Sequence, residues 1–367
     1  MDKKYIYIGV GLVVLLIIIK KKESFKKYNK TYYKCDKYKM IKVVDDIFTK
    51  YGIMKTQCDN SYNCKKYDIY IPCTYNTLET DILKMKTYDG QVIFGISGCD
   101  KIVSKNNLWR LIELKYGREK ARKIMPESWL LMNKSSMELF KKSYKKGEVY
   151  IMKKNLQRKL GLKLTTDYNE IINGHKDGFI VVQKYMKDLY LLNNRKINLR
   201  VYMLIVCKDN KKTVYMYKNG KCIYTNKDYK KDSLEEEENI TSVNLDLDIY
   251  KKSPFDFNEL KEYIGNPSYS KLFSNIKENI KKVMIASKIE ICNNKELKKN
   301  ITYQLFGLDY IFDNDYNVYL LEANKGPNMN STYEKDYKLK YNVMLDVFDK
   351  INIINTNKSN SFIEIKI

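Results

Sequence analysis

Short stretches of alternating apolar and polar residues, which predict β-strands, recur along this chain of 367 residues. The clearest lie in residues 305–329, LFGLDYIFDNDYNVYLLEANKGPNM, where two strand-like runs flank a polar turn and predict a hairpin. Residues 179–206 predict two further strands, and residues 148–164 predict a short strand, a basic loop and another short strand. Apolar residues at helical spacing predict packing helices over 105–123 and 268–291. The chain therefore mixes strands with helices.

The predicted hairpin brings oxygen-bearing side chains together. A turn that is symmetric about Asp315 and Tyr316 sets the register of its strands. In that register Asp309 faces Glu322 across the ladder, and Asn324 follows Glu322 on the same side. Two facing carboxylates repel each other by roughly 0.2 to 1 kcal/mol, so a cation such as Mg²⁺ between them is the economical explanation. A solvated hairpin edge is the alternative, which the apolar neighbours disfavour.

Another predicted strand carries polar residues on one face. In RKINLRVYMLIV, Lys196, Asn198 and Arg200 alternate with apolar residues and therefore point the same way. Such a face suits a cleft for anionic phosphates and a ribose; a polar face in water is the alternative. Lys153, at the end of a different strand, can reach phosphate oxygens while the following loop covers them. A solvated surface lysine is the alternative there.

The order and chemistry of these segments resemble the tubulin-tyrosine ligase-like family, over residues 92–329. The matching segments are PESWLL (126–131), similar to the family's Pro-Glu-Thr/Ser-aromatic segment; YIMKK (150–154), similar to its Trp-Ile-Val-Lys-Pro strand; VVQKYM (181–186), similar to its adenine hinge; RKINLRVYML (195–204), similar to its Lys-Phe-Asp-Leu-Arg-Val-Tyr strand; and FGLDYIF (306–312) with LLEANKGP (320–327), similar to its metal-binding strands.

This resemblance implies an α+β, ATP-grasp fold, in which two α+β subdomains clamp ATP. It also implies a ligase that uses ATP and Mg²⁺ to join an amino acid to a protein carboxylate through an acyl phosphate. Catalytic roles would fall to Arg200 and Lys153. The full set of implied site residues is Asp309, Glu322 and Asn324 for Mg²⁺; Gln183, Lys184, Tyr185 and Met186 for adenine; Lys196 and Asn198 for the ribose; Lys153 for phosphates; and Arg200 for the γ-phosphate or acyl phosphate.

Several departures from the family pattern leave a second hypothesis open. Asn198 stands where the family has an aspartate, and the loop after Lys153 holds only Gly161 where two glycines are usual. Near Tyr224 the family has an arginine, which is absent here. The alternative function is a catalytically silent ATP-grasp relative that acts as a membrane-anchored binding module. The pattern resembles most the divergent members carried by large DNA viruses, so the substrate is not inherited from the family name.

An apolar run at residues 5–19, flanked by lysines, predicts an uncleaved transmembrane helix. A cleaved signal peptide is the alternative, but the following KKKESFKK lacks a small-residue cleavage pattern. The excess of lysine after the run predicts a single-pass membrane protein with its catalytic domain in the cytoplasm, in a host or virion membrane if the protein is viral. The predicted domains are an anchor (1–22), an additional region (23–90), the ATP-grasp domain (91–345) and a C-terminal tail (346–367).

The formal net charge of +24 is spread along the chain rather than gathered in one patch. A basic surface of this kind attracts acidic protein tails or anionic lipids, so no specific nucleic acid is expected. The predicted partners are a free amino acid, a protein with an acidic tail, for which tubulin is a candidate, and the membrane. Eight cysteines without a Cys-x-x-Cys pair predict reduced thiols, and a disulfide or a metal site is the alternative for the four between residues 35 and 73. The single histidine, His175, is predicted to lie on the surface.

Overall fold

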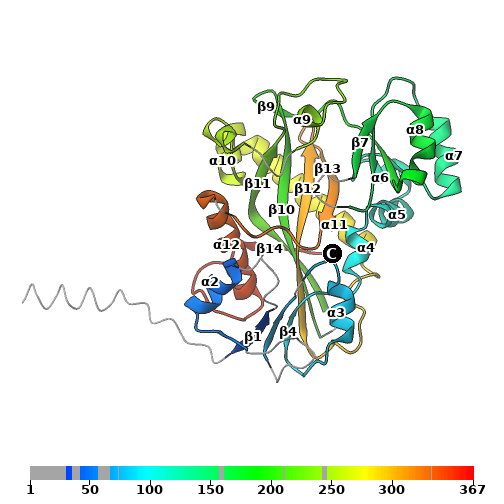
Figure 1. The fold of residues 1–367 in the computed structure, drawn as a ribbon. Helices are drawn as coiled ribbons and strands as arrows, with labels where there is room; N and C mark the ends of the chain where they lie inside the picture. The colour runs from blue at the N-terminus through cyan, green and yellow to red at the C-terminus, as the bar shows by residue number, and fades with distance from the viewer. Residues whose placement is uncertain are drawn as a thin grey trace, which may run out of the picture.

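The computed structural model describes residues 30–34, 42–56, 67–72, 74–156, 161–209, 211–241, 246–331 and 333–367. These residues form two β-sheets with helices packed around them, which confirms the predicted mixed α+β class (Figure 1). The smaller sheet lies beside the upper part of the larger one in this view. This arrangement is consistent with a fold of the ATP-grasp type.

The larger sheet has the strand order β14-β11-β10-β12-β4-β3-β1-β2, with β13 paired to β12 and β9 paired to β10. Its strands are β1 (Thr31–Lys34), β2 (Met54–Lys55), β3 (Ile69–Ile71), β4 (Val92–Phe94), β9 (Leu191–Leu192), β10 (Arg195–Lys208), β11 (Lys211–Tyr224), β12 (Ile301–Phe312), β13 (Val318–Asn324) and β14 (Phe362–Ile365). Pairing is antiparallel from β14 to β13 and parallel from β12 through β4 and β3 to β1 and β2.

The smaller sheet has the order β5-β8-β6-β7, and all its pairs are antiparallel. It consists of β5 (Ser128–Leu130), β6 (Tyr150–Lys153), β7 (Leu162–Thr165) and β8 (Val181–Lys184). Its own core contains the buried rings of Trp129, Phe140 and Tyr150, which meet edge to face. The predicted strands within 148–164 and at the start of 179–206 are thereby confirmed as β6, β7 and β8.

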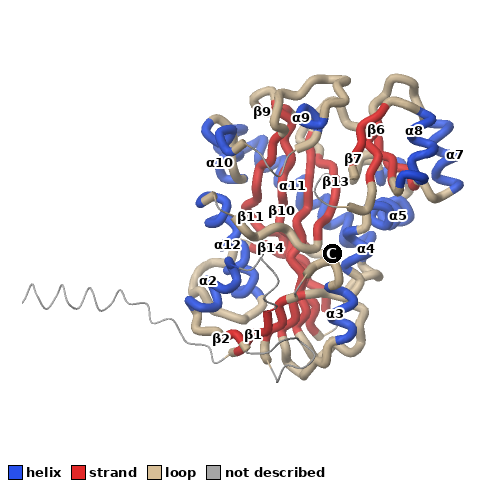
Figure 2. Tube along the Cα trace, in the orientation of Figure 1, coloured by secondary structure: helices blue, strands red, loops and turns tan. Residues whose placement is uncertain are grey.

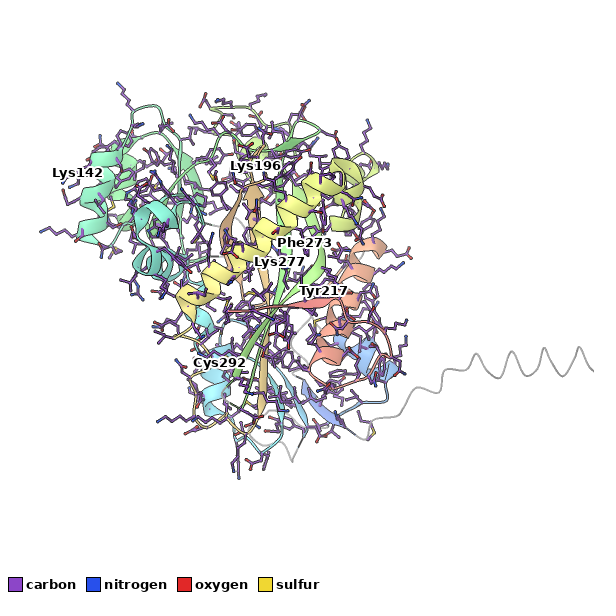
Figure 3. The ribbon with its side chains drawn as sticks, turned by 180° about the vertical axis from the view of Figure 1, so that it is seen from behind. Lys142, Lys196, Tyr217, Phe273, Lys277 and Cys292 are labelled. Atoms are coloured by element: carbon purple, nitrogen blue, oxygen red, sulfur yellow. A yellow bond between two sulfur atoms is a disulfide. The ribbon has the colours of Figure 1, made fainter. Side chains whose placement is uncertain are left out.

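Helices surround both sheets (Figure 2). They are α2 (Lys42–Lys50), α3 (Leu78–Lys84), α4 (Cys99–Val103), α5 (Lys105–Tyr116), α6 (Arg118–Ala121), α7 (Lys134–Ser143), α8 (Tyr168–Asn173), α9 (Glu236–Asn239), α10 (Phe257–Ile264), α11 (Asn266–Ser287) and α12 (Glu334–Lys350). The helix predicted at 105–123 is two helices, because Gly117 takes a positive φ of 73° that ends α5. The helix predicted at 268–291 is α11, which crosses the back of the larger sheet (Figure 3).

Segments outside the predicted catalytic domain also enter the larger sheet. β1, β2 and β3 come from the predicted additional region, and β14 comes from the predicted C-terminal tail and pairs with β11. The boundaries of the predicted domains themselves stay predictions.

None of the helices in the described parts of the chain combines the length and the apolar composition that crossing a membrane requires. Even α11, with 22 residues, carries lysines along its solvent face. This finding overturns the predicted single-pass membrane localisation, and it gives no support to the predicted membrane partner. The apolar run at 5–19 itself lies outside the described residues.

A disulfide joins Cys207, near the end of β10, to Cys292, which follows α11. The prediction of reduced thiols is therefore wrong for this pair, because strand and loop bring together cysteines that lie 85 residues apart in the sequence. Cys99 and Cys222 are free and buried. The cysteines at positions 35, 58, 64 and 73 lie outside the described residues.

Candidate active site

The β12–β13 hairpin has the register that the sequence predicts at its chemically important pair. Asp309 and Glu322 are direct partners across the two strands. The turn closes because the Asp313 carboxylate accepts hydrogen bonds from the amides of Asp315 and Asn317, at 3.0 and 2.9 Å.

Nearer the turn, Phe312 pairs with Val318, so the turn is centred on Asp315 rather than between Asp315 and Tyr316 as predicted. One extra residue in β13, Leu321, forms a bulge and shifts the register by one, so that Asp309 meets Glu322.

Asn324 lies on the same side of β13 as Glu322. Its Nδ2 donates a hydrogen bond to Glu322 Oε1 at 3.0 Å, which fixes the two side chains side by side. The Oδ1 atom of Asn324 accepts no hydrogen bond among the described residues. The structure thus brings together the three predicted metal ligands, although their binding of a metal stays a prediction.

Arg200 is the direct partner of Asp309 on the other side of β12. The guanidinium holds the carboxylate with two parallel hydrogen bonds, Nε to Oδ1 and Nη2 to Oδ2, the second at 3.0 Å. Gly307 makes room for this side chain, because a Cβ there would lie 3.0 Å from Arg200 Cδ. Burial raises the pKa of Asp309 to about 6, and Arg200 opposes that rise. Arg200 therefore keeps a negative charge in place on this face.

Glu322 carries the second negative charge. Burial acts to raise its pKa, but Lys105 and the hydrogen bond from Asn324 bring it below its usual value. Lys105 Nζ lies 3.7 Å from Glu322 Oε2 and donates to the carbonyl oxygen of Leu156 at 2.9 Å. Sequence patterns gave no sign of Lys105, which begins α5 more than two hundred residues before Glu322.

Two buried lysines come from opposite sheets. Lys153, at the end of β6, is 6% exposed, and Lys196, near the start of β10, is 7% exposed. Burial lowers the pKa of Lys153 to about 8, and burial with the positive charge of Lys153 lowers that of Lys196 to about 7. Lys196 donates to the carbonyl oxygen of Asn239 at 3.1 Å, whereas the Lys153 ammonium has no hydrogen-bond partner among the described residues. An anion between the two sheets would stabilise both charges.

The predicted adenine residues divide into two groups. Tyr185 is buried against Lys196, and its hydroxyl donates to Asn239 Oδ1 at 2.9 Å. The amide of Gln183 is instead turned to β5, where it donates to Ser128 Oγ at 2.8 Å. Lys184 and Met186 are half-buried. The structure therefore places Tyr185 beside Lys196, while the Gln183 side chain connects β8 to β5.

Asn198 is 8% exposed, and its Oδ1 has no hydrogen-bond partner in the described parts of the chain. An unpaired buried oxygen costs about 1–3 kcal/mol, so this position favours a ligand that donates a hydrogen bond. A ribose hydroxyl has that chemistry. Asn198 lies two residues from both Lys196 and Arg200 on β10, so all three side chains share one face.

The structure also shows where His175 and Tyr224 lie. His175 is exposed, as predicted. Tyr224 is fully buried and donates to the carbonyl oxygen of Pro254 at 2.8 Å, so it belongs to the core. Arg195 Nη1 donates to the carbonyl oxygen of Thr225, next to Tyr224, at 2.8 Å. Lys221 lies three residues before Tyr224 on β11, where it is the direct partner of Arg200. Comparison with the family's sequence pattern does not reveal Lys221, because Lys221 does not stand at the position of the family's arginine.

Comparison with known proteins identifies the family. A model of the tubulin-tyrosine ligase family matches residues 83–361. Tubulin glycylase 3B of Drosophila melanogaster is 26% identical over 205 residues, which cover 51% of this chain and 26% of that protein. A probable β-tubulin polyglutamylase of Tetrahymena thermophila is 24% identical over 345 residues, which cover 86% of this chain and 28% of that protein.

The chain thus spans between 26% and 28% of the length of these two relatives. The predicted likeness to viral members is unconfirmed and stays a prediction. Because the family model covers most of the chain, the protein belongs to the tubulin-tyrosine ligase family.

Proposed function

We propose that this protein is a ligase that uses ATP and Mg²⁺ to join an amino acid to a carboxylate of a protein, through an acyl phosphate. The observation that carries the proposal is the direct pairing of Asp309 with Glu322, which Arg200 flanks on one side and Asn324 on the other. A structural hairpin has no need of two facing carboxylates. A site that holds a cation beside phosphates does.

The donor set fits Mg²⁺. This hard cation takes oxygen ligands, and Asp309, Glu322 and Asn324 offer two carboxylates and one amide oxygen on a single face. When bound, the metal would offset the negative charge of the transferred phosphate. Arg200 keeps the Asp309 carboxylate oriented before any metal arrives, and Lys105 does the same for Glu322.

The chain's own cations fit the remaining charge of a triphosphate. Lys153 and Lys196 are buried ammonium groups from the two sheets, and both lose part of their proton affinity to burial. Binding phosphate oxygens would compensate that loss. Asn198, two residues from Lys196, supplies an acceptor that no described residue pairs with, which suits a ribose hydroxyl. Lys153 would hold phosphate oxygens, and Tyr185 would border the base.

Arg200 would act at the reacting carboxylate. Its Nε and Nη2 hold Asp309, and its Nη1 forms no hydrogen bond with the described residues. That remaining donor group can stabilise the charge that develops on the acyl phosphate. The incoming amine then needs positioning and charge stabilisation rather than a dedicated base. This is consistent with the exposed place of the only histidine, His175.

We infer that the acceptor is an acidic protein tail. Relatives of this chain carry names of tubulin glycylases and tubulin polyglutamylases, which supports a protein acceptor and makes tubulin a candidate. The formal net charge of +24 favours encounter with an acidic chain. A free amino acid is the second substrate.

The test measures ADP release and product mass. The protein is incubated with ATP, Mg²⁺, mixed amino acids and a panel of acidic tail peptides, and the Glu322→Gln variant serves as the control. ADP release with a mass gain on one peptide, absent from the variant, would establish the ligase and its substrates. ATP binding without ADP release, even with cell extract as acceptor, would favour the catalytically silent relative. Asn198 and the lack of an arginine in the KCIYT segment also support that alternative.

A further inference from the structure

One row of charged residues runs straight across four strands of the larger sheet. Lys221 on β11 is the direct partner of Arg200 on β10, Arg200 of Asp309 on β12, and Asp309 of Glu322 on β13. Directly opposed residues point to the same face of a sheet. The site face therefore continues past Arg200 to Lys221, a cation that belongs neither to the carboxylate pair nor to the lysines of the nucleotide side.

Beyond β11, the backbone of Lys221 forms a β-bridge with Asp256, whose carboxylate accepts from the amides that begin α10 and from Asn219. The Lys221 ammonium also lies 5.3 Å from the centroid of the Phe255 ring.

Lys221 shares one counter-ion with a second lysine. Its Nζ donates to Asp336 Oδ1 at 2.9 Å, and Lys340 Nζ donates to Asp336 Oδ2 at 2.6 Å. Burial acts to raise the pKa of Asp336, but the two lysines hold it below its usual range, so this carboxylate stays ionised. Two ammonium groups and one carboxylate leave the cluster with a net charge of one positive unit.

The two lysines differ in how open they are. The Lys340 side chain is 8% exposed and is occupied by Asp336 and the carbonyl oxygen of Asn330, at 2.7 Å. The Lys221 side chain is 21% exposed, and among the described residues its ammonium makes only the one hydrogen bond, to Asp336. Because an ammonium group has three donors, Lys221 is the member of the cluster that can accept a further ligand.

Distance along the row separates Lys221 from the metal ligands. Neighbouring strands lie about 4.8 Å apart, so the backbone of Lys221 is roughly 5 Å from that of Arg200 and roughly 14 Å from that of Glu322. Lys221 is therefore a neighbour of Arg200 and of the reacting carboxylate at which Arg200 is proposed to act. It is too far along the row to serve a phosphate held at Glu322.

We propose that Lys221, oriented by Asp336 and backed by Lys340, binds the carboxylate of a substrate next to Arg200. This inference rests on the proposed function, because it names a binding residue of the same site. Two substrates bring such a carboxylate: the free amino acid, through its α-carboxylate, and the acidic tail, through a side chain beside the one that reacts. Lys221 thereby positions one substrate and supplies a cation from β11, the neighbour of β10.

The experiment compares Lys221→Met and Lys221→Arg with Lys218→Met, a matched change of an exposed lysine on the same strand. Lys340 still neutralises Asp336 in Lys221→Met, so the fold is retained. A charge-assisted hydrogen bond is worth about 1.5–3 kcal/mol, so we expect KM for one substrate to rise about tenfold to a hundredfold. Lys221→Arg keeps the charge and should restore most of this loss, and Lys218→Met should behave as the unaltered protein.

The substrates are titrated separately, with glycine and L-glutamate as amino acids and hexaglutamate as the acidic peptide. A raised KM for the amino acid assigns the α-carboxylate to Lys221, and a raised KM for the peptide assigns the tail. The thermal shift caused by ATP with Mg²⁺ should be the same in all variants. Unchanged KM values for both substrates overturn the proposal, as does loss of the ATP response in Lys221→Met, which would show a structural role.

Equilibrium titration of the same three probes, in the presence of a non-hydrolysable ATP analogue and Mg²⁺, separates this proposal from the ligase proposal. If no turnover is found but a probe binds to the unaltered protein and not to Lys221→Met, the carboxylate site stands while the ligase assignment fails. If no probe binds, or all bind equally to Lys221→Met, the carboxylate site is refuted.

Discussion

The ammonium group of Lys196 lies 4.6 Å from the centroid of the Tyr185 ring, and both side chains are buried. This contact and the hydrogen bond to Asn239 replace only part of the water that the charge loses on folding. In the ligand-free protein Lys196 therefore lowers the stability of the fold, a cost that the proposed binding of phosphates would offset.

A pH dependence follows from this burial. The unfolded chain keeps Lys196 protonated up to its ordinary pKa of 10.5, whereas the folded chain releases the proton at about 7. Between these values the unfolded state binds more protons, so the contribution of Lys196 to the free energy of unfolding rises with pH. We expect Lys196→Met to be more stable than the unaltered protein at pH 7, by at least about 1 kcal/mol, with a smaller advantage at pH 9.5.

Denaturant unfolding at the two pH values measures this difference, and Lys142→Met, at an exposed position on α7, is the control. An advantage that is the same at both pH values would contradict a titrating Lys196. The same variant should lose its thermal shift with ATP, which tests the role of Lys196 in binding separately from its effect on stability.

Glu322→Gln should remove the effect of Mg²⁺ on ATP binding. Glutamine can still accept the hydrogen bond from Asn324, so the hairpin is retained, but one negative ligand is lost. A ligand at a hundred times its Kd stabilises the folded state by about 2.7 kcal/mol. We expect the Mg²⁺-dependent part of that gain, read as a thermal shift, to disappear in this variant.

The matched control is Glu364→Gln, the same chemical change at an exposed position on β14. A melting shift with ATP and Mg²⁺ that is equal in Glu322→Gln and in the control would refute the metal site.

Asn198→Leu should weaken ATP binding without harming the fold. The substitution removes a buried oxygen that has no partner among the described residues, so the free energy of unfolding should stay within about 1 kcal/mol or rise. Loss of a neutral hydrogen bond, worth about 0.5–1.5 kcal/mol, should raise the Kd for ATP by about two- to tenfold. Calorimetric titration checks the affinity, and a Kd equal to that of the unaltered protein would separate Asn198 from the ribose.

The disulfide between Cys207 and Cys292 should stabilise the folded chain. It closes a loop with a sequence separation of 85 residues, for which about 2–4 kcal/mol is typical. We expect a reductant to lower the denaturation midpoint of the unaltered protein and to leave that of the Cys207→Ser, Cys292→Ser double variant unchanged. Equal sensitivity of both proteins to the reductant would assign the effect to other cysteines.

The sequence was sufficient to predict those features that depend on residues close together along the chain. The hairpin and the shared face of Lys196 and Arg200 follow from the two-residue period of a strand. The pairing of Asp309 with Glu322 was predicted from a symmetric turn, and the structure reaches it through a bulge at Leu321. Such patterns are local. They need no knowledge of how distant segments pack.

Tertiary packing decided the rest. Lys105 reaches Glu322 only because α5 lies beside the hairpin, and Asp336 reaches Lys221 only because α12 lies beside β11. No spacing in the chain relates these residues. Gln183 was correctly placed on its strand, but the structure turns its amide to Ser128, a choice set by the pairing of β8 with β5.

The two sheets are assembled from very different spans of the chain. Strands β5 to β8 come from one continuous stretch, whereas β12 pairs with β4, about two hundred residues earlier, and with β10. Closing loops of that length is slow, so the smaller sheet is expected to form first and the larger sheet last. Lys153 would then be in place before Asp309 meets Arg200. A partly folded chain could then bind phosphate through Lys153 before the catalytic residues are assembled. Completion of the larger sheet would be the folding step at which this protein becomes competent for catalysis.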